Sequence, residues 1–260
     1  MAETQRVFVF HLKRANGTPL FLHPFSSPAR LIELLPKARV EGRYGDEPMV
    51  ESLTKLRDEL YRMVDAAVRV WIGDLRFIPR FLLSAGIFLV AYFLAGYLIR
   101  EPIPILPDVA IGIAAAVIGY GWLGKRYGAS TAASNKRDEL RAAVDRIAFT
   151  ESSFLLRVEL ELHDSEAREA EAIRRIVSPM EHALDTAERE EAEHLVGMLE
   201  RRFDLRRLRR DERVLKRFVD DGEPAASAPS IKRWLELQRL DAPLYALYKG
   251  FKRTVQSLRS

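Results

Sequence analysis

The hydrophobic positions of this 260-residue chain are concentrated in two uncharged runs near its centre. The first run, residues 81–99, reads FLLSAGIFLVAYFLAGYLI and lies between Arg80 and Arg100. The second run, residues 109–124, reads VAIGIAAAVIGYGWLG and is followed by Lys125 and Arg126. A membrane-spanning helix needs about 20 apolar residues to cross about 30 Å of hydrocarbon. The pattern therefore predicts two transmembrane helices, over residues 81–99 and about 105–124.

A proline-rich segment separates the two runs. Residues 100–108 read REPIPILPD, and three prolines within six residues cannot continue a helix. The chain is therefore expected to reverse here and to form a tight antiparallel helical hairpin over residues 80–124. Asp108 is expected to cap the second helix. Because the second run is short for a span, a re-entrant or interfacial segment is the alternative.

The cations around the hairpin predict its orientation. Nine lysines and arginines lie on its outer flanks: Arg62, Arg69, Arg76, Arg80, Lys125, Arg126, Lys136, Arg137 and Arg141. The connecting segment contains only Arg100. Because cytoplasmic flanks of membrane helices are enriched in Lys and Arg, both termini are expected in the cytoplasm. The pattern thus predicts a multi-pass protein of the inner (plasma) membrane.

The first 46 residues have the pattern of a small α/β unit. Residues 6–13 (RVFVFHLK) and 20–22 are rich in strand-forming residues, and Asn16-Gly17 between them is a strong signal for a β-hairpin turn. A short helix is expected over residues 29–35, and a third strand over residues 39–44. The predicted unit is ββαβ-like.

Two segments beside the hairpin carry apolar residues at alternating spacings of three and four. In the helix expected over residues 47–79, these are Leu53, Leu56, Leu60, Met63, Ala67 and Val70. After the hairpin, the same spacing is shown by Leu140, Val144, Ile147, Glu151, Phe154 and Val158. Such spacing is a heptad seam. It predicts an antiparallel helix pair within one chain or, alternatively, a coiled coil between chains.

The charges after the hairpin fall into opposed blocks. Residues 151–193 contain thirteen acids and five Lys and Arg, whereas residues 199–218 contain nine Lys and Arg and four acids. Such blocks are typical of solvated helices that pair with each other. A cytoplasmic helical domain is therefore expected over residues 125–221. Within it, Ser178, Pro179 and Glu181 predict a helix start with a capping box, and that helix is expected to reach Val219.

A small-residue linker over residues 222–229, which reads GEPAASAP, is expected to precede a basic amphipathic helix over residues 230–260. Trp234, Lys249, Lys252 and Arg253 are the candidates for contact with an anionic membrane surface. Docking of the same apolar stripe on the helical domain is the alternative.

Composition changes this picture little. The chain has 41 Lys and Arg against 37 Asp and Glu, a formal net charge of +4, so no nucleic-acid partner is expected. It has no cysteine, which excludes disulfides, thiolate metal sites and cysteine nucleophiles. The averages resemble those of a soluble protein because the two apolar runs are a small part of the chain.

The motifs for chemistry are sparse. The sequence has no glycine-rich phosphate loop and no serine in a nucleophile elbow. Glu191 and His194 have the Glu-x-x-His spacing that places two metal ligands on one helix face, and Glu159 and His163 lie one turn apart. One such motif falls short of a two-metal carboxylate site. These residues are a weak metal candidate, and no enzymatic activity and no cofactor are predicted.

Small residues cluster on one face of the second run. They are Gly112, Ala115, Ala116 and Gly119, and the first run has Ala91 and Ala95. Small residues four apart allow helices to approach closely. This face is expected to pack against the first helix of the same hairpin. Alternatively, second helices from several subunits converge on an axis, and Asp108 and Glu101 then ring the outer mouth of a cation-selective pore.

The sequence therefore predicts a mainly α membrane protein: a two-span transmembrane helical hairpin, a long-helix cytoplasmic bundle and a small N-terminal ββαβ-like unit. The expected function is that of a scaffold or regulatory protein without enzymatic activity. Its expected partners are the lipid bilayer, further copies of itself and a cytoplasmic protein. The alternatives are an oligomeric cation channel lined by the second span and a metal-binding cytoplasmic helical domain.

Overall fold

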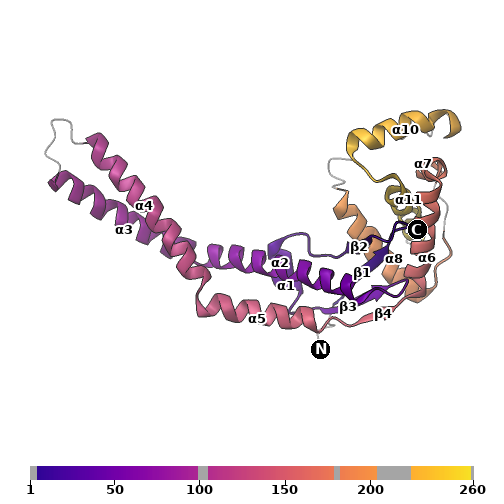
Figure 1. The fold of residues 1–260 in the computed structure, drawn as a ribbon, viewed down its shortest axis with the longest axis horizontal. Helices are drawn as coiled ribbons and strands as arrows, with labels where there is room; N and C mark the ends of the chain where they lie inside the picture. Colours follow the sequence, from indigo (N-terminus) through magenta and orange to yellow (C-terminus); the bar gives the residue numbers. More distant parts are fainter. Residues whose placement is uncertain (1–4, 99–104, 179–181, 204–223, 259–260) are drawn as a thin grey trace. The chain divides into compact units, whose positions relative to one another are not determined.

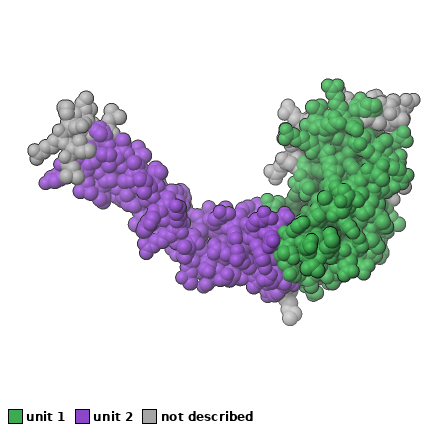
Figure 2. Space-filling view, viewed as in Figure 1, with its two compact units in different colours: residues 1–26, 37–57, 147–260 green, residues 27–36, 58–146 purple. Residues whose placement is uncertain are grey.

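A computed structural model describes residues 5–98, 105–178, 182–203 and 224–258 of the chain. The fold is mostly helical with one small sheet, and two of its helices are long and apolar enough to cross a membrane. The chain divides into two compact units, shown in green and purple in Figure 2. Unit 1 comprises residues 1–26, 37–57 and 147–260, and unit 2 comprises residues 27–36 and 58–146.

The sheet of unit 1 has four strands in the order β2-β1-β3-β4 (Figure 1). β1 (Arg6–Lys13) pairs antiparallel with β2 (Pro19–Leu22) through the predicted Asn-Gly turn, in which Gly17 has a φ of 78°. β3 (Arg39–Tyr44) lies parallel to β1, and α1 (Pro28–Leu34) connects β2 to β3 in sequence. The ββαβ order predicted for the first 46 residues is thus confirmed.

The fourth strand was not predicted. β4 (Phe149–Glu151) comes from the segment after the hairpin and lies parallel to β3, with Gly42 opposite Phe149. The heptad seam predicted over residues 140–158 is therefore interrupted. A Cβ on Gly42 would lie 2.5 Å from the Phe149 ring, so the glycine leaves room for the aromatic side chain.

One face of the sheet is covered by helices from the C-terminal half of the chain. Phe8, Phe10 and Leu12 on β1 belong to one buried apolar cluster with residues of those helices. The helices in contact with the strands are α6 (Ser153–Ala167) and α8 (Thr186–Arg202). α7 (Glu169–Val177), α10 (Pro224–Gln238) and α11 (Ala242–Ser257) pack against these helices and one another. β1 and β2 therefore share one core with the helices of the C-terminal half of the chain.

Unit 2 holds most of α2 (Val50–Leu75) and all of α3 (Phe77–Leu98), α4 (Ile105–Gly128) and α5 (Thr131–Asp145). α3 begins four residues before the predicted span, and Pro79 lies in its first turn, where the missing N–H costs no hydrogen bond. α4 begins at Ile105, so Asp108 lies within the first turn and does not cap the helix. α3 and α4 lie side by side as an antiparallel pair (Figure 1).

The seam predicted on α2 is buried in part. Leu56, Leu60 and Ala67 of that seam are buried, whereas Val70 is 46% exposed. Val64, Val68 and Ile72, which are not members of the predicted seam, are buried as well. Within unit 2, Asp65 of α2 forms ion pairs with Arg137 and Arg141 of α5.

Three further predictions in the C-terminal half need correction. The capping box lies at Asp185 and Glu188, which start α8, and Ser178 instead ends α7. Glu181 and most of the predicted helix beyond α8, including Val219, lie outside the described residues. The predicted linker is largely helical because α10 begins at Pro224. The expected single helix over residues 230–260 is two helices, because Arg239 has a φ of 55° and Asp241 caps α11.

Candidate functional site

The surface of the α3–α4 hairpin is apolar along its length. On α3 it exposes Phe81, Leu82, Leu83, Leu89, Val90, Phe93, Leu94 and Tyr97, and on α4 it exposes Ile111, Ile113, Val117, Ile118 and Trp122. The apolar windows of the two helices cover Phe77–Tyr97 and Pro107–Gly128, and only 6% and 17% of their residues are buried. A core helix of a soluble protein buries its apolar residues, so these two helices differ from a core helix by leaving most of their apolar residues exposed.

Glycines of α4 receive large side chains of α3. A Cβ on Gly112 would lie 2.8 Å from the Phe88 ring, and a Cβ on Gly119 would lie 2.6 Å from Ile87. The hydroxyl of Ser84 donates a hydrogen bond of 2.8 Å to the carbonyl oxygen of Ala116. The glycines thus allow close contact within one hairpin, as in the first of the two packing alternatives.

The other small residues of the hairpin are less enclosed. Ala95 is buried, whereas Ala91, Ala115 and Ala116 are half-buried. Gly86 of α3 has no atom within 4 Å of the position that a Cβ would take. The described part of the hairpin therefore has one glycine face that is filled by its own partner helix, whereas Gly86 of α3 and Gly121 of α4 are open.

Arginine and aromatic side chains gather at the end of the hairpin nearest α2 and α5 in sequence. The Arg80 guanidinium lies 3.5 Å from the centroid of the Tyr120 ring, and its Nε donates 2.8 Å to the Tyr120 carbonyl. Gly124 makes room for it, since a Cβ there would overlap the guanidinium. The Arg76 guanidinium lies over the Tyr127 ring, 5.8 Å from its centroid. Aromatic and arginine side chains are enriched at the interfaces of membranes with water.

The acidic pore candidates are placed only in part. Asp108 is 4% exposed, its carboxylate faces Gly96 of α3, and its Oδ1 has no hydrogen-bond partner among the described residues. Glu101 lies outside the described residues. The pore therefore stays a prediction.

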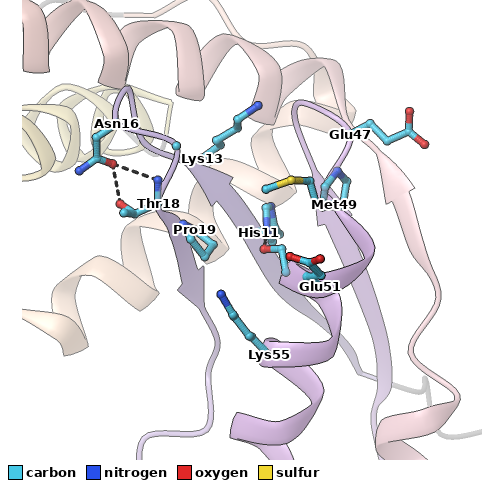
Figure 3. A pocket seen from close by; sticks show the side chains of 12 residues that line it. His11, Lys13, Asn16, Thr18, Pro19, Glu47, Met49, Glu51 and Lys55 are labelled. Atoms are coloured by element: carbon cyan, nitrogen blue, oxygen red, sulfur yellow. Dashed lines mark hydrogen bonds between the residues drawn. The ribbon is translucent and has the colours of Figure 1, made fainter.

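A second feature is a pocket of unit 1, of about 250 Å³, between the β1–β2 turn and the start of α2 (Figure 3). His11 and Ser52 form its buried part, with exposed fractions of 2% and 7%. Nε2 of His11 lies 2.6 Å from the Ser52 hydroxyl. Pro19 and Met49 supply apolar walls, and the rim carries Lys13, Glu47, Glu51 and Lys55.

The His11–Ser52 pair has only part of a nucleophilic arrangement. Burial lowers the pKa of His11, so the ring is neutral near pH 7 and can accept the serine proton. A base of this kind is normally oriented by a third group on its other nitrogen. Nδ1 of His11 has no hydrogen-bond partner in the described part of the chain. His11 and Ser52 therefore form a polar floor of the pocket.

The four metal candidates are not brought together. Glu159 accepts backbone N–H groups of Lys13 and Asp46, each at 2.7 Å, and burial raises its pKa. His163 donates to the Lys13 carbonyl at 2.7 Å.

The other two candidates also have structural partners in unit 1. Glu191 accepts from Ser152 and pairs with Arg43, and His194 donates to the Glu190 carbonyl. Among the described residues, no group of three His, Asp or Glu side chains is placed to hold a metal ion. The metal site therefore stays a prediction without a supporting cluster in the described part of the chain.

Most of the C-terminal candidates for contact with a membrane surface pack against other residues of unit 1. Trp234 is 7% exposed in the apolar core, Lys252 donates to the Tyr248 hydroxyl at 2.8 Å, and Lys249 lies over the Tyr245 ring. Only Arg253 is exposed. Of the two alternatives for this stripe, the structure favours docking on the helical domain, because the apolar side of α11 is buried.

Comparison of the chain with protein-family models, with curated proteins and with solved structures finds no match. The assignment of function therefore depends on the geometry alone.

Two groups of residues were missed from the sequence. Arg80 was counted only as a positive charge, although an arginine and an aromatic residue at facing helix ends are a recognisable sign of a membrane interface. Glu51 and Lys55 have the spacing of one helical turn, but nothing in the sequence places them beside His11. That proximity arises because the start of α2 lies against β1.

Proposed function

We propose that this chain is an integral membrane protein, anchored by α3 and α4, whose unit 1 acts in the cytoplasm as a non-enzymatic scaffold or regulator. The observation that carries the proposal is the exposed apolar surface of the hairpin, bounded by the contacts of Arg80 with Tyr120 and Arg76 with Tyr127. Such a surface is stable in lipid and costly in water.

The same end of the hairpin supports an orientation. Arginine and lysine flanks favour the cytoplasmic side, and both Arg76 and Arg80 lie at the end that leads into α2. Unit 1, with both chain termini, is then cytoplasmic, and the segment between α3 and α4 faces the opposite side. The lack of cysteine in the chain allows this to be tested by single-cysteine labelling.

For the test, the chain is expressed in bacterial cells and extracted with alkaline carbonate, which leaves integral proteins in the membrane pellet. A membrane-impermeant maleimide applied to spheroplasts is expected to label Glu101→Cys and not Ala15→Cys. Detergent lysis is expected to expose Ala15→Cys to the same reagent. Release of the chain by carbonate would contradict the anchor, and labelling of Ala15→Cys in intact spheroplasts would contradict the orientation.

Self-association is part of the proposal and is supported by an apolar hollow of about 600 Å³ on α3. Its lining consists of Leu82, Leu83, Gly86, Ile87, Val90, Ala91 and Leu94. Because Gly86 is open, a helix of a second copy can approach the backbone closely there.

Disulfide cross-linking in membranes tests this contact. Val90→Cys, which lines the hollow and is 60% exposed, is expected to form a covalent dimer on oxidation. Val117→Cys on α4 is 65% exposed but lies outside the hollow, so it is the matched control. Equal cross-linking of both variants, or of neither, would contradict a second copy at this hollow.

A further inference from the structure

The pocket beside β1 has a feature that membrane anchoring does not use. Glu51 and Lys55 lie one turn apart on α2, and both line the pocket. Side chains of opposite charge at this spacing commonly pair on a helix surface. Here no ion pair joins them, and neither has a partner in the described part of the chain. The pocket therefore presents an uncompensated carboxylate and an uncompensated ammonium to anything that enters it.

The other two charged side chains of the rim, Lys13 and Glu47, either have an ion-pair partner or point away from His11. The Lys13 ammonium pairs with Asp46 at 2.8 Å. The Glu47 carboxylate points away from His11, whereas the Lys55 side chain extends toward Pro19 (Figure 3). Glu51 and Lys55 are thus the two charges that a small ligand meets.

The floor and walls of the pocket offer a ligand polar and apolar contacts that carry no charge. The neutral His11 ring holds the Ser52 hydroxyl, which lies in the first turn of α2. Met49, which is 66% exposed, and Pro19 form an apolar wall. A volume of about 250 Å³ suits a ligand smaller than a typical drug.

We propose that this pocket binds a free amino acid with an apolar side chain, its ammonium group on Glu51 and its carboxylate on Lys55. The opposite charges of the ligand replace the missing contact between the two side chains. Its apolar side chain lies against Met49 and Pro19.

The experiment uses the full chain in detergent micelles and isothermal titration calorimetry with each of the twenty free amino acids. Saturable binding of one or more apolar amino acids, such as L-valine or L-leucine, is expected. The N-acetylated and the amidated forms of the same amino acid are expected to bind at least tenfold more weakly, because each lacks one charge.

Variants identify the site. Glu51→Gln and Lys55→Met are each expected to weaken binding at least tenfold. Asp58→Asn and Arg57→Met, which change exposed charges of α2 outside the pocket, are the matched controls and are expected to bind as the parent chain does. Because all four positions are exposed, the fold is expected to be unchanged, and circular dichroism checks it.

Three results would overturn the proposal: no binding by any free amino acid, binding that the pocket variants leave unchanged, or binding of simple carboxylates that requires Lys55 but not Glu51. The last result would identify an anion site instead. None of these results bears on membrane anchoring, which carbonate extraction tests separately.

Discussion

The buried carboxylate of Glu159 on α6 accepts the backbone N–H of Lys13, at the end of β1, at 2.7 Å. Its second oxygen accepts the N–H of Asp46, just after β3, also at 2.7 Å. One side chain thus joins the ends of two neighbouring strands to the helix that covers them. Gly45 allows this, because a Cβ there would lie 2.5 Å from the carboxylate.

Glu159→Gln is expected to lower the free energy of unfolding by about 1–3 kcal/mol. A glutamine presents its NH₂ group to one of the two N–H donors, which leaves a buried donor unpaired. Urea titration of the detergent-solubilised chain, followed by tryptophan fluorescence, measures the change. Glu236→Gln, at an exposed position of α10, is the control and is expected to change stability by less than about 0.5 kcal/mol.

His11 is expected to make stability depend on pH. Burial lowers its pKa below the ordinary value of 6.5, so the unfolded chain takes up a proton before the folded chain does. The contribution of the neutral ring is therefore complete above about pH 6.5 and is lost progressively as the pH falls below that value. Urea titrations of the parent chain and of His11→Gln between pH 7.5 and about pH 5 measure the effect.

The difference in unfolding free energy between the parent and His11→Gln is expected to shrink as the pH falls. Glu159 has the opposite trend, because its raised pKa favours the folded chain at lower pH. Since Glu159 is present in both chains, its effect cancels in the difference between their unfolding free energies. A difference that stays constant over this range would show that His11 titrates alike in the folded and unfolded chains.

Gly112→Ala is expected to destabilise the α3–α4 hairpin by about 1–3 kcal/mol, because the added methyl group meets the Phe88 ring at 2.8 Å. Gly121→Ala on the same helix is the matched control, since no atom lies within 4 Å of its Cβ position. That change is expected to be neutral or to stabilise by up to about 1 kcal/mol. Thermal unfolding in detergent micelles compares the two variants, and equal midpoints would contradict the packing described here.

Phe251→Ala is expected to cost about 3–5 kcal/mol of stability, because its ring is fully buried between Phe154 and His182. Leu258→Ala, at a position that is 41% exposed, is the control and is expected to cost much less. Urea titration measures both. If α11 instead served as a membrane-surface helix, Phe251→Ala would reduce binding to anionic vesicles and leave the unfolding free energy nearly unchanged.

The elements that the sequence predicts well are those with a local cause. The uncharged runs that contain Phe88 and Gly112 are too long and too apolar for other common structures, and both are helices here. The Asn16-Gly17 turn needs only its own residues, because Gly17 adopts a positive φ and Thr18 donates to the Asn16 side chain. Such features depend on neighbours in sequence.

The errors arise where a distant segment decides the outcome. β4 has three residues, too few to show an alternating pattern, and it exists because Phe149 packs on Gly42 of β3. Glu159 and His163 resembled metal ligands by spacing alone, yet their partners are backbone groups of Lys13 that the fold brings to them. Ser52 had no distinguishing neighbour in sequence and became part of a pocket only beside His11.

The sequence by itself determined the two apolar helices, the turn between β1 and β2 and the amphipathic character of the C-terminal segment. These follow from chain length, charge and residue spacing, which act over one or two turns of helix or strand. Only the tertiary structure decided that Trp234 and Phe251 are core residues and that β4 completes the sheet. It also decided that Glu51 and Lys55 face one pocket. An amphipathic pattern shows that the apolar face of a helix must be buried. Which segment packs on that face depends on which distant surface has the complementary shape.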